Sequence, residues 1–350
     1  MNSMQRCLAA LAHQEPDRVP LFLLATLHGA RELGMPIAEY FSAAEHVVEG
    51  QLRLFRKYRG DCLYAFFYAA IEAEAWGGST HFRADGPPAC GEPVIGSASL
   101  IDRLDPPAID DAPGLLRVIE TIRRLSDFAG DRVPVIGVAI SPFSLPVMQM
   151  GFAAYLDLIH DDRARFEQLM RVNEEFTVSW ANAQLAAGAT AICYFDPLSA
   201  ASVIPPALYR QTGRRVARRT LARITGPTAT HLASGRALPI MGDLADTGTL
   251  AVGVSALEDL RVLKAAAGDR VALLGNLNGV EMRRWTPVRA EAEVRRAIAG
   301  AARGGGFILS DNHGEIPWQV ADQVLMAIGD AVERWGRYPL DWIPSAARAG

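Results

Sequence analysis

Short apolar runs alternate with longer segments of helical periodicity along most of the chain. The apolar runs bounded by turn residues cover 19–25, 61–68, 133–140, 189–195, 226–233, 250–255, 270–276 and 306–310. Between most of them, apolar residues recur at i, i+3, i+4 and i+7, most clearly over 161–188. Runs that are apolar at successive positions indicate parallel strands covered by helices on the outside. Eight strands alternating with helices predict an α/β fold, the (β/α)8 TIM barrel.

The segment between the second and third apolar runs is longer than one helical crossover needs. Residues 71–132 are rich in glycine, proline and polar side chains around 77–99, which predicts a hairpin or loops inserted after the second strand. The sequence has no Gly- or Ser-rich linker and no internal repeat. It therefore predicts one domain over 1–350, with 71–132 as its insertion.

Composition and charge narrow the class of protein. The chain has 350 residues, of which 50% are hydrophobic and 21% charged, and a net charge of −4. Its most basic stretch, 214–223, has the spacing of a solvated helix face, so nucleic acid is not an expected partner. No apolar run is long enough to span a membrane. The four cysteines, Cys7, Cys62, Cys90 and Cys193, form no CxxC pair, which indicates a reduced cytoplasmic protein.

Polar side chains stand at or just beyond the ends of the predicted strands. In a barrel of parallel strands these carboxyl ends share one rim, where active sites lie. The residues that we expect there are His28, Tyr68, Ser141, Asp196, His231, Asn276, Asp311 and His313.

Several motifs follow one another in an order typical of a known superfamily. They include "DRVP" near the start, "PVIGVAISPFSLPVMQMG", "AAGATAICYFDPLSA", "LLGNLNGVEM" and "GGGFILSDNHGEIP". The chain resembles the uroporphyrinogen decarboxylase superfamily, and more closely its corrinoid-dependent methyltransferase branch. That branch contains methylcobamide:coenzyme M methyltransferases and the methyltransferase components of O-demethylase systems. The resemblance implies a small methylated substrate and a corrinoid (cobalamin) carried on a separate protein that docks transiently. It leaves open whether the chain forms a homodimer.

The chain departs from the superfamily's patterns at two places. Where true decarboxylases carry several arginines that clamp substrate carboxylates, the stretch 27–40 offers only Arg31. Where thiol-methylating members hold zinc with a His-x-Cys pair and a distant Cys, this chain has His231, Ala233 and His313. Both thiolates are missing, which puts dependence on zinc and coenzyme M as acceptor in doubt.

Two hypotheses explain the histidines at the rim. His231 and His313 with one carboxylate, from Glu315, Asp311 or Asp243, would make a two-His, one-carboxylate metal site. Alternatively, the histidines act as acid–base or hydrogen-bonding groups. Removing a methyl group from an ether or amine requires stabilisation of the leaving heteroatom, which a metal or a proton donor supplies. We therefore expect catalytic roles for His231, His313, Asp196 and Glu315, and metal ligation, if any, by His231, His313 and Glu315.

Other polar residues are candidates for substrate binding, each with a structural alternative. These candidates are His28, Tyr68, Glu72, Asn276 and Asp311. Asp196 equally fits a helix cap or turn, Asn276 a turn beside Gly275, and Tyr68 core packing with its aromatic neighbours.

Together these patterns predict a demethylase component, an enzyme that moves methyl between an O- or N-methylated small molecule and the cobalt of a corrinoid protein. One alternative is a decarboxylase of a small carboxylated ring. Another is a catalytically silent barrel that binds a corrinoid protein.

Overall fold

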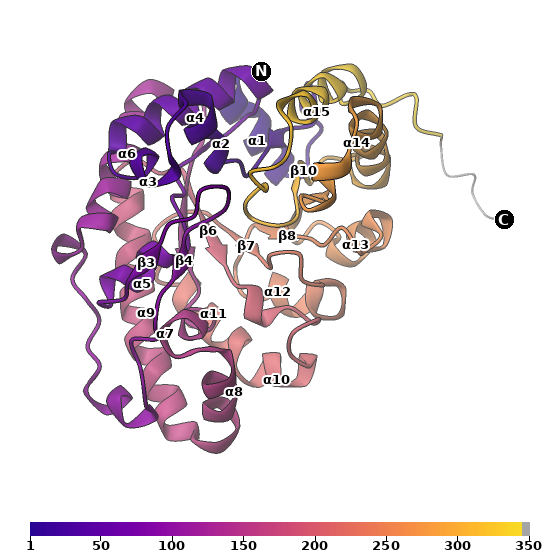
Figure 1. Cartoon of the computed structure of the whole chain (residues 1–350). Coiled ribbons are helices and arrows are strands. Elements are labelled where there is room, and N and C mark those ends of the chain that lie inside the picture. Colours follow the sequence, from indigo (N-terminus) through magenta and orange to yellow (C-terminus); the bar gives the residue numbers. More distant parts are fainter. Residues whose placement is uncertain (345–350) are drawn as a thin grey trace.

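The computed structural model describes residues 1–344 and shows the predicted (β/α)8 barrel; residues 345–350 of the predicted domain lie outside this range. Eight parallel strands hydrogen-bond in the order β1-β10-β9-β8-β7-β6-β5-β2, and helices surround them (Figure 1). All eight predicted strands are present. Their bounds are β1 Leu21–Phe22, β2 Leu63–Tyr64, β5 Val135–Ile140, β6 Ala191–Phe195, β7 Thr228–His231, β8 Ala251–Gly253, β9 Ala272–Leu277 and β10 Phe307–Asp311.

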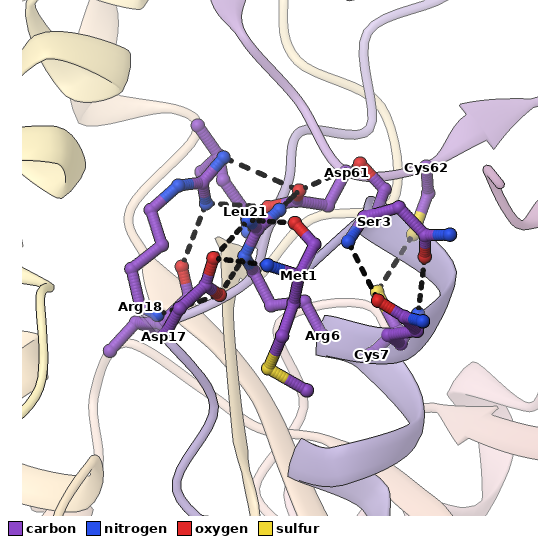
Figure 2. Close-up of polar contacts among 12 residues, drawn as sticks. Met1, Ser3, Arg6, Cys7, Asp17, Arg18, Leu21, Asp61 and Cys62 are labelled. Atoms are coloured by element: carbon purple, nitrogen blue, oxygen red, sulfur yellow. Dashed lines mark hydrogen bonds and ion pairs between the residues drawn. The ribbon is translucent and has the colours of Figure 1, made fainter.

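Asp61 joins the two edge strands at the seam of the barrel. Its backbone N–H donates to the Leu21 carbonyl at 2.7 Å, and its Oδ2 accepts from the Leu21 N–H at 2.8 Å (Figure 2). Here β1 and β2 are shorter than the predicted runs 19–25 and 61–68. Side chains supply partners at this seam: the Leu24 N–H, beyond β1, donates to Asp311, and the Tyr64 N–H, within β2, donates to Gln51.

Helices cover the outside of the barrel and one of its ends. The α-helices are α1 Ser3–Leu11, α2 Leu27–Leu33, α3 Ile37–Tyr40, α4 Ala44–Tyr58, α5 Ala70–Ala75, α6 Pro113–Ala129, α7 Pro146–Met150, α8 Phe152–Asp161, α9 Arg163–Ala186, α10 Pro206–Gln211, α11 Gly213–Leu221, α12 Met241–Ala245, α13 Leu260–Ala267, α14 Pro287–Ala301 and α15 Asp322–Trp335. Short 3-10 helices are η1 Ala98–Arg103, η2 Ile109–Asp111, η3 Pro197–Ser199, η4 Leu238–Ile240 and η5 Glu281–Arg284. The helix predicted over 161–188 is α9, and the Asp162 carboxylate caps it by accepting from the Arg165 N–H.

The insertion after β2 contains the predicted hairpin. Strands β3 Thr80–His81 and β4 Ala89–Cys90 pair in antiparallel fashion as a separate two-stranded sheet. The chain then runs through η1 and η2 into α6, which is the crossover helix to β5.

The barrel strands are almost wholly buried, with apolar side chains both inside the barrel and against the helices. The residues that cluster inside include Phe22, Tyr64, Val138, Cys193, Leu274 and Ile308. Strand register aligns the carboxyl ends, so that Phe195 lies beside His231 and Ser310 beside Asn276. Within residues 1–344, no helix is both long and apolar enough to cross a membrane.

Candidate active site

The loop after β10 is the centre of the rim, and Asp311 holds its shape. The buried Asp311 carboxylate accepts from the N–H groups of His313 (3.0 Å), Gly314 (3.3 Å) and, across the seam, Leu24 (3.0 Å). Burial raises the pKa of Asp311, and these N–H groups oppose the rise. Since both carboxylate oxygens accept hydrogen bonds from backbone N–H groups, the geometry favours a positioning role for Asp311 over the predicted substrate contact.

His313 is exposed at the rim and is tied to the loop after β7. Its Nδ1 lies 2.9 Å from the Ser234 hydroxyl, and the Ser234 N–H donates to the Asn312 carbonyl at 2.6 Å. Ser234 stands three positions after His231, so this contact brings the two histidines to one mouth, as predicted. The sequence offered no signal for Ser234, because its φ of 64° and its partner depend on the fold.

His231 ends β7 and is buried under the rim. Its Nδ1 accepts from the Ala233 N–H at 3.2 Å, and its ring stacks on Phe195 with centroids 5.5 Å apart. Gly253 makes room for the ring, since a Cβ there would lie 2.4 Å from His231 Cδ2. Burial, reinforced by the charge of His313, lowers the pKa of His231 to about 4.

The tautomer of His231 follows from these contacts. A neutral imidazole whose Nδ1 accepts a hydrogen bond carries its proton on Nε2. That Nε2 is buried and has no protein partner among the described residues. A buried donor without an acceptor costs free energy, so the group is available to a bound ligand.

Glu315 is a buried acid beside the start of α2. Its Oε1 accepts from the N–H groups of Thr26 (3.1 Å) and Leu27 (3.0 Å), whereas its buried Oε2 has no partner among the described residues. Burial raises the pKa of Glu315 to about 8, against the lowering effect of these N–H groups. At neutral pH the group therefore holds a proton, and Oε2 is the oxygen free to carry it.

The predicted metal site is not assembled by this geometry. Within residues 1–344, no three His, Cys, Asp or Glu side chains are grouped so that they could hold a metal ion. The Glu315 carboxylate faces α2, and Asp243 pairs with Arg210 and Arg214 on the outside. The residues present therefore do not fit zinc, and acid–base chemistry is the hypothesis that the geometry favours.

Asp196 has a structural role, the alternative to the predicted catalytic one. Its carboxylate accepts from the hydroxyls of Ser141 (2.6 Å), Ser144 (2.7 Å) and Ser199 (2.5 Å), and it is fully buried. Burial raises its pKa, and the three hydroxyls oppose this. Because its acceptors are occupied, the catalytic role predicted for Asp196 lacks geometric support; it fastens α7 and η3 to the ends of β5 and β6.

Four predicted substrate-binding residues have partners away from the histidines. Buried His28 places Nε2 3.3 Å from the Val320 carbonyl, between α2 and the segment before α15. The Tyr68 hydroxyl donates to Glu74. Glu72 accepts from the Ile140 N–H, and Asn276 donates to the carbonyls of Ser255 and Glu258. The structure thus groups His231, His313 and Asp311 around the loop after β10, and places the Glu315 carboxylate at the start of α2.

An apolar pocket that was not predicted lies on the other side of Phe195 from His231. It has a volume of about 270 Å³ between α7, the start of α8 and η3. Its lining contains no charged side chain, and includes Ile140, Val147, Met148, Phe152, Phe195 and Leu198. Because Phe195 also stacks on His231, the pocket and the imidazole share one wall.

Comparisons with known proteins identify the family. The family model described as "Uroporphyrinogen decarboxylase (URO-D)" matches residues 2–335. The chain belongs to the uroporphyrinogen decarboxylase family. Among curated relatives, uroporphyrinogen decarboxylase from Xylella fastidiosa is 28% identical, covering 95% of this chain and 98% of its own. The Idiomarina loihiensis enzyme of the same name is 25% identical, covering 94% and 95%.

Solved structures agree on the barrel. A methyltransferase from Methanosarcina mazei superposes with a TM-score of 0.82 at 19% identity, covering 95% of this chain and 99% of that one. A B12-independent methionine synthase from Shewanella gives 0.54 at 11% identity, covering 91% and 95%. At these identities the likeness concerns the fold. The two structures show the fold of this chain and leave its reaction open.

Proposed function

We propose that this protein is a methyltransferase that moves methyl between an O- or N-methylated small molecule and the cobalt of a corrinoid carried by a separate protein. The observation that carries the proposal is the presence of two unpartnered buried donors, Nε2–H of His231 at the end of β7 and the protonated Oε2 of Glu315 beside the start of α2. When bound, the corrinoid supplies the nucleophile or the leaving group for the methyl carbon. The chain's own groups act on the heteroatom.

His231 and Glu315 have different parts in this reaction. With a pKa near 4, the His231 ring is neutral at physiological pH and stabilises developing negative charge through an Nε2–H hydrogen bond. Glu315, with a pKa near 8, still holds a proton at neutral pH and can pass it to a departing oxygen or nitrogen. This assigns proton transfer to Glu315 instead of the histidines. His313 stands exposed at the rim, where an incoming partner would meet it.

The apolar pocket supports a neutral or weakly polar methylated substrate. A carboxylated ring in it would lose water without gaining a cation, because no charged residue lines the pocket. The Ser144 hydroxyl, its one polar side chain, already donates to Asp196. At the lip, Phe152 and Val203 are large apolar side chains with substantial exposed surface, which suits contact with a corrinoid or its carrier.

The name that the curated relatives carry favours a second candidate, a decarboxylase. Such an enzyme needs cations for substrate carboxylates. Arg31 donates instead to the carbonyls of Trp318 and Val320 and pairs with Asp322. That engagement argues for methyl transfer. A catalytically silent barrel is the third candidate, and measured turnover in either assay rejects it.

One experiment separates the candidates. The purified protein is mixed with cob(I)alamin and a panel of O- and N-methylated ring compounds, and methylation of cobalt is followed by absorbance. We expect turnover that falls about 100-fold in His231→Phe, which keeps the ring stacked on Phe195 but removes the Nε2–H. His160→Phe, at an exposed site on α8, is the matched control. Release of carbon dioxide from uroporphyrinogen, with no cobalt methylation across the panel, would overturn the proposal.

A further inference from the structure

Two cysteines that are distant in sequence meet where α1 covers the amino-terminal end of the barrel. Cys7 lies on α1 and Cys62 directly precedes β2, and their Sγ atoms are 3.9 Å apart (Figure 2). Both line an apolar cavity of about 100 Å³ between α1 and the barrel interior. This end is opposite the rim that carries the histidines.

Polar contacts of neighbouring residues fix the positions of the two cysteines relative to each other. Arg6, beside Cys7, donates through Nη1 to Oδ1 of Asp61, beside Cys62, at 2.6 Å. The Ser3 hydroxyl donates to the same oxygen at 3.0 Å (Figure 2). The Asp61 carboxylate is fully buried, so these bonds fix the position of α1 against β2.

We propose that Cys7 and Cys62 are an oxidation site that forms an intrachain disulfide and locks α1 onto the barrel. The inference is independent of the function proposed above. Closing the sulfurs from 3.9 Å to a bond length of about 2 Å needs a small movement, for which the adjacent cavity leaves room.

The oxidant is a low-molecular-weight disulfide, and the exchange is balanced. One cysteine thiolate attacks the disulfide, forms a mixed disulfide and releases one small thiol. The second cysteine, on losing its proton, attacks the protein sulfur of the mixed disulfide and releases the other small thiol. Two protein thiols are oxidised, and the small disulfide is reduced to two thiols. Cys62 is the first to react, because it keeps part of its surface exposed while Cys7 is buried.

The reaction should be slow at neutral pH and faster in alkali. Contact with Cys7 and burial raise the pKa of Cys62, so its thiolate is scarce near pH 7. The cross-link closes a long loop through α1, the seam and β2, which restricts the unfolded chain. It should therefore raise thermal stability without touching the rim.

The test uses the full-length folded protein with oxidised glutathione at pH 7 and pH 9. We expect peptide mapping to find a Cys7–Cys62 cross-link that forms faster at pH 9, and a rise in Tm of several degrees that dithiothreitol reverses. Cys90→Ser should leave both results unchanged, and Cys7→Ser and Cys62→Ser should each abolish them. If Cys7→Ser does not fold, Cys7→Ala replaces it.

Two results would overturn the proposal. One is a folded protein in which glutathione leaves Cys7 and Cys62 unlinked at both pH values, or links them only after addition of urea. The other is a cross-linked protein whose Tm equals that of the reduced form, which would remove the locking role.

Discussion

The Nδ1 atom of His313 lies 2.9 Å from the hydroxyl oxygen of Ser234, which joins the loop after β10 to the loop after β7. This contact orients the exposed His313 imidazole, which has no other partner among the described hydrogen bonds. It also links the two segments that carry the buried donors His231 and Glu315. The rim is therefore organised by loop-to-loop bonds that no single segment contains.

Ser234→Ala should release His313 without unfolding the protein. We expect kcat for methyl transfer to fall about 10-fold, because the loop that carries Glu315 loses a tether to the loop after β7 and small displacements of a proton donor are costly. Tm should stay within two or so degrees of the wild-type value. Ser97→Ala, which removes a surface hydroxyl paired with Ser99, is the control. An unchanged kcat would show that this tether is dispensable.

Gly314→Ala should displace the loop after β10. A Cβ at this position would lie 2.6 Å from Cε2 of Phe195, and the φ of 97° disfavours any other residue. We expect a loss of about 2–4 kcal/mol in the free energy of unfolding, measured by urea denaturation. Gly96→Ala, with open space around it, should change stability by no more than about 0.5 kcal/mol. Equal effects of the two substitutions would contradict the close approach to Phe195.

Asp61→Asn should weaken the seam of the barrel. The fully buried Asp61 carboxylate is paired with Arg6 at 2.6 Å and Arg18 at 2.7 Å, so neutralising it leaves Arg6 only Asp17 and Arg18 only Glu333 as charged partners. We expect a loss of about 2–3 kcal/mol in urea denaturation. Asp330→Asn removes an exposed pair with Arg59 and should cost at most about 1 kcal/mol. A small effect at Asp61 would mean that the buried charges are solvated.

Glu315 sets the alkaline limit of the proposed reaction. Its pKa of about 8 means that the protonated form dominates below pH 8 and is lost above it, so kcat should decline as pH rises through 8. Glu315→Gln keeps an acceptor for Thr26 and Leu27 but has no proton to give. It should lower kcat about 100-fold at pH 7 and abolish the decline. A pH profile in Glu315→Gln that matches wild type would remove Glu315 as the acid.

Glu72 should make the protein less stable as pH rises. Burial holds the pKa of Glu72 near 8, above its ordinary value of 4.5. Between these values the folded state keeps a proton that the unfolded state has lost, so stability falls by at most about 1.4 kcal/mol per pH unit. In Glu72→Gln the Tm should fall less between pH 5 and pH 8, although Glu315 contributes a slope of the same sign. A slope in Glu72→Gln identical to that of the wild type would contradict the buried proton.

The sequence predicted which residues lie at the candidate site only in part, because the role of each residue depends on contacts with distant segments. Convergence of His231 and His313 followed from strand order, because carboxyl ends of parallel strands share an edge. From the sequence, Asp196 could equally bind substrate or cap a turn. Its structural role depends on hydrogen bonds from Ser141 and Ser144, more than 50 positions away. His28 likewise faces the Val320 carbonyl, across the chain from its own segment. The spacing of residues along the chain does not predict such distant hydrogen-bond partners.

Periodicity determined the barrel and its eight strands, because each strand and helix must bury an apolar face of its own. Segment length and glycine and proline content indicated an inserted hairpin or loops. Tertiary structure alone decided which polar atoms keep a proton and which have no partner. Protonation depends on desolvation and on charges brought from distant segments, as for His231 near 4 and Glu315 near 8. Tertiary structure also decided the contact between Cys7 and Cys62, since only the closed barrel places α1 against the start of β2.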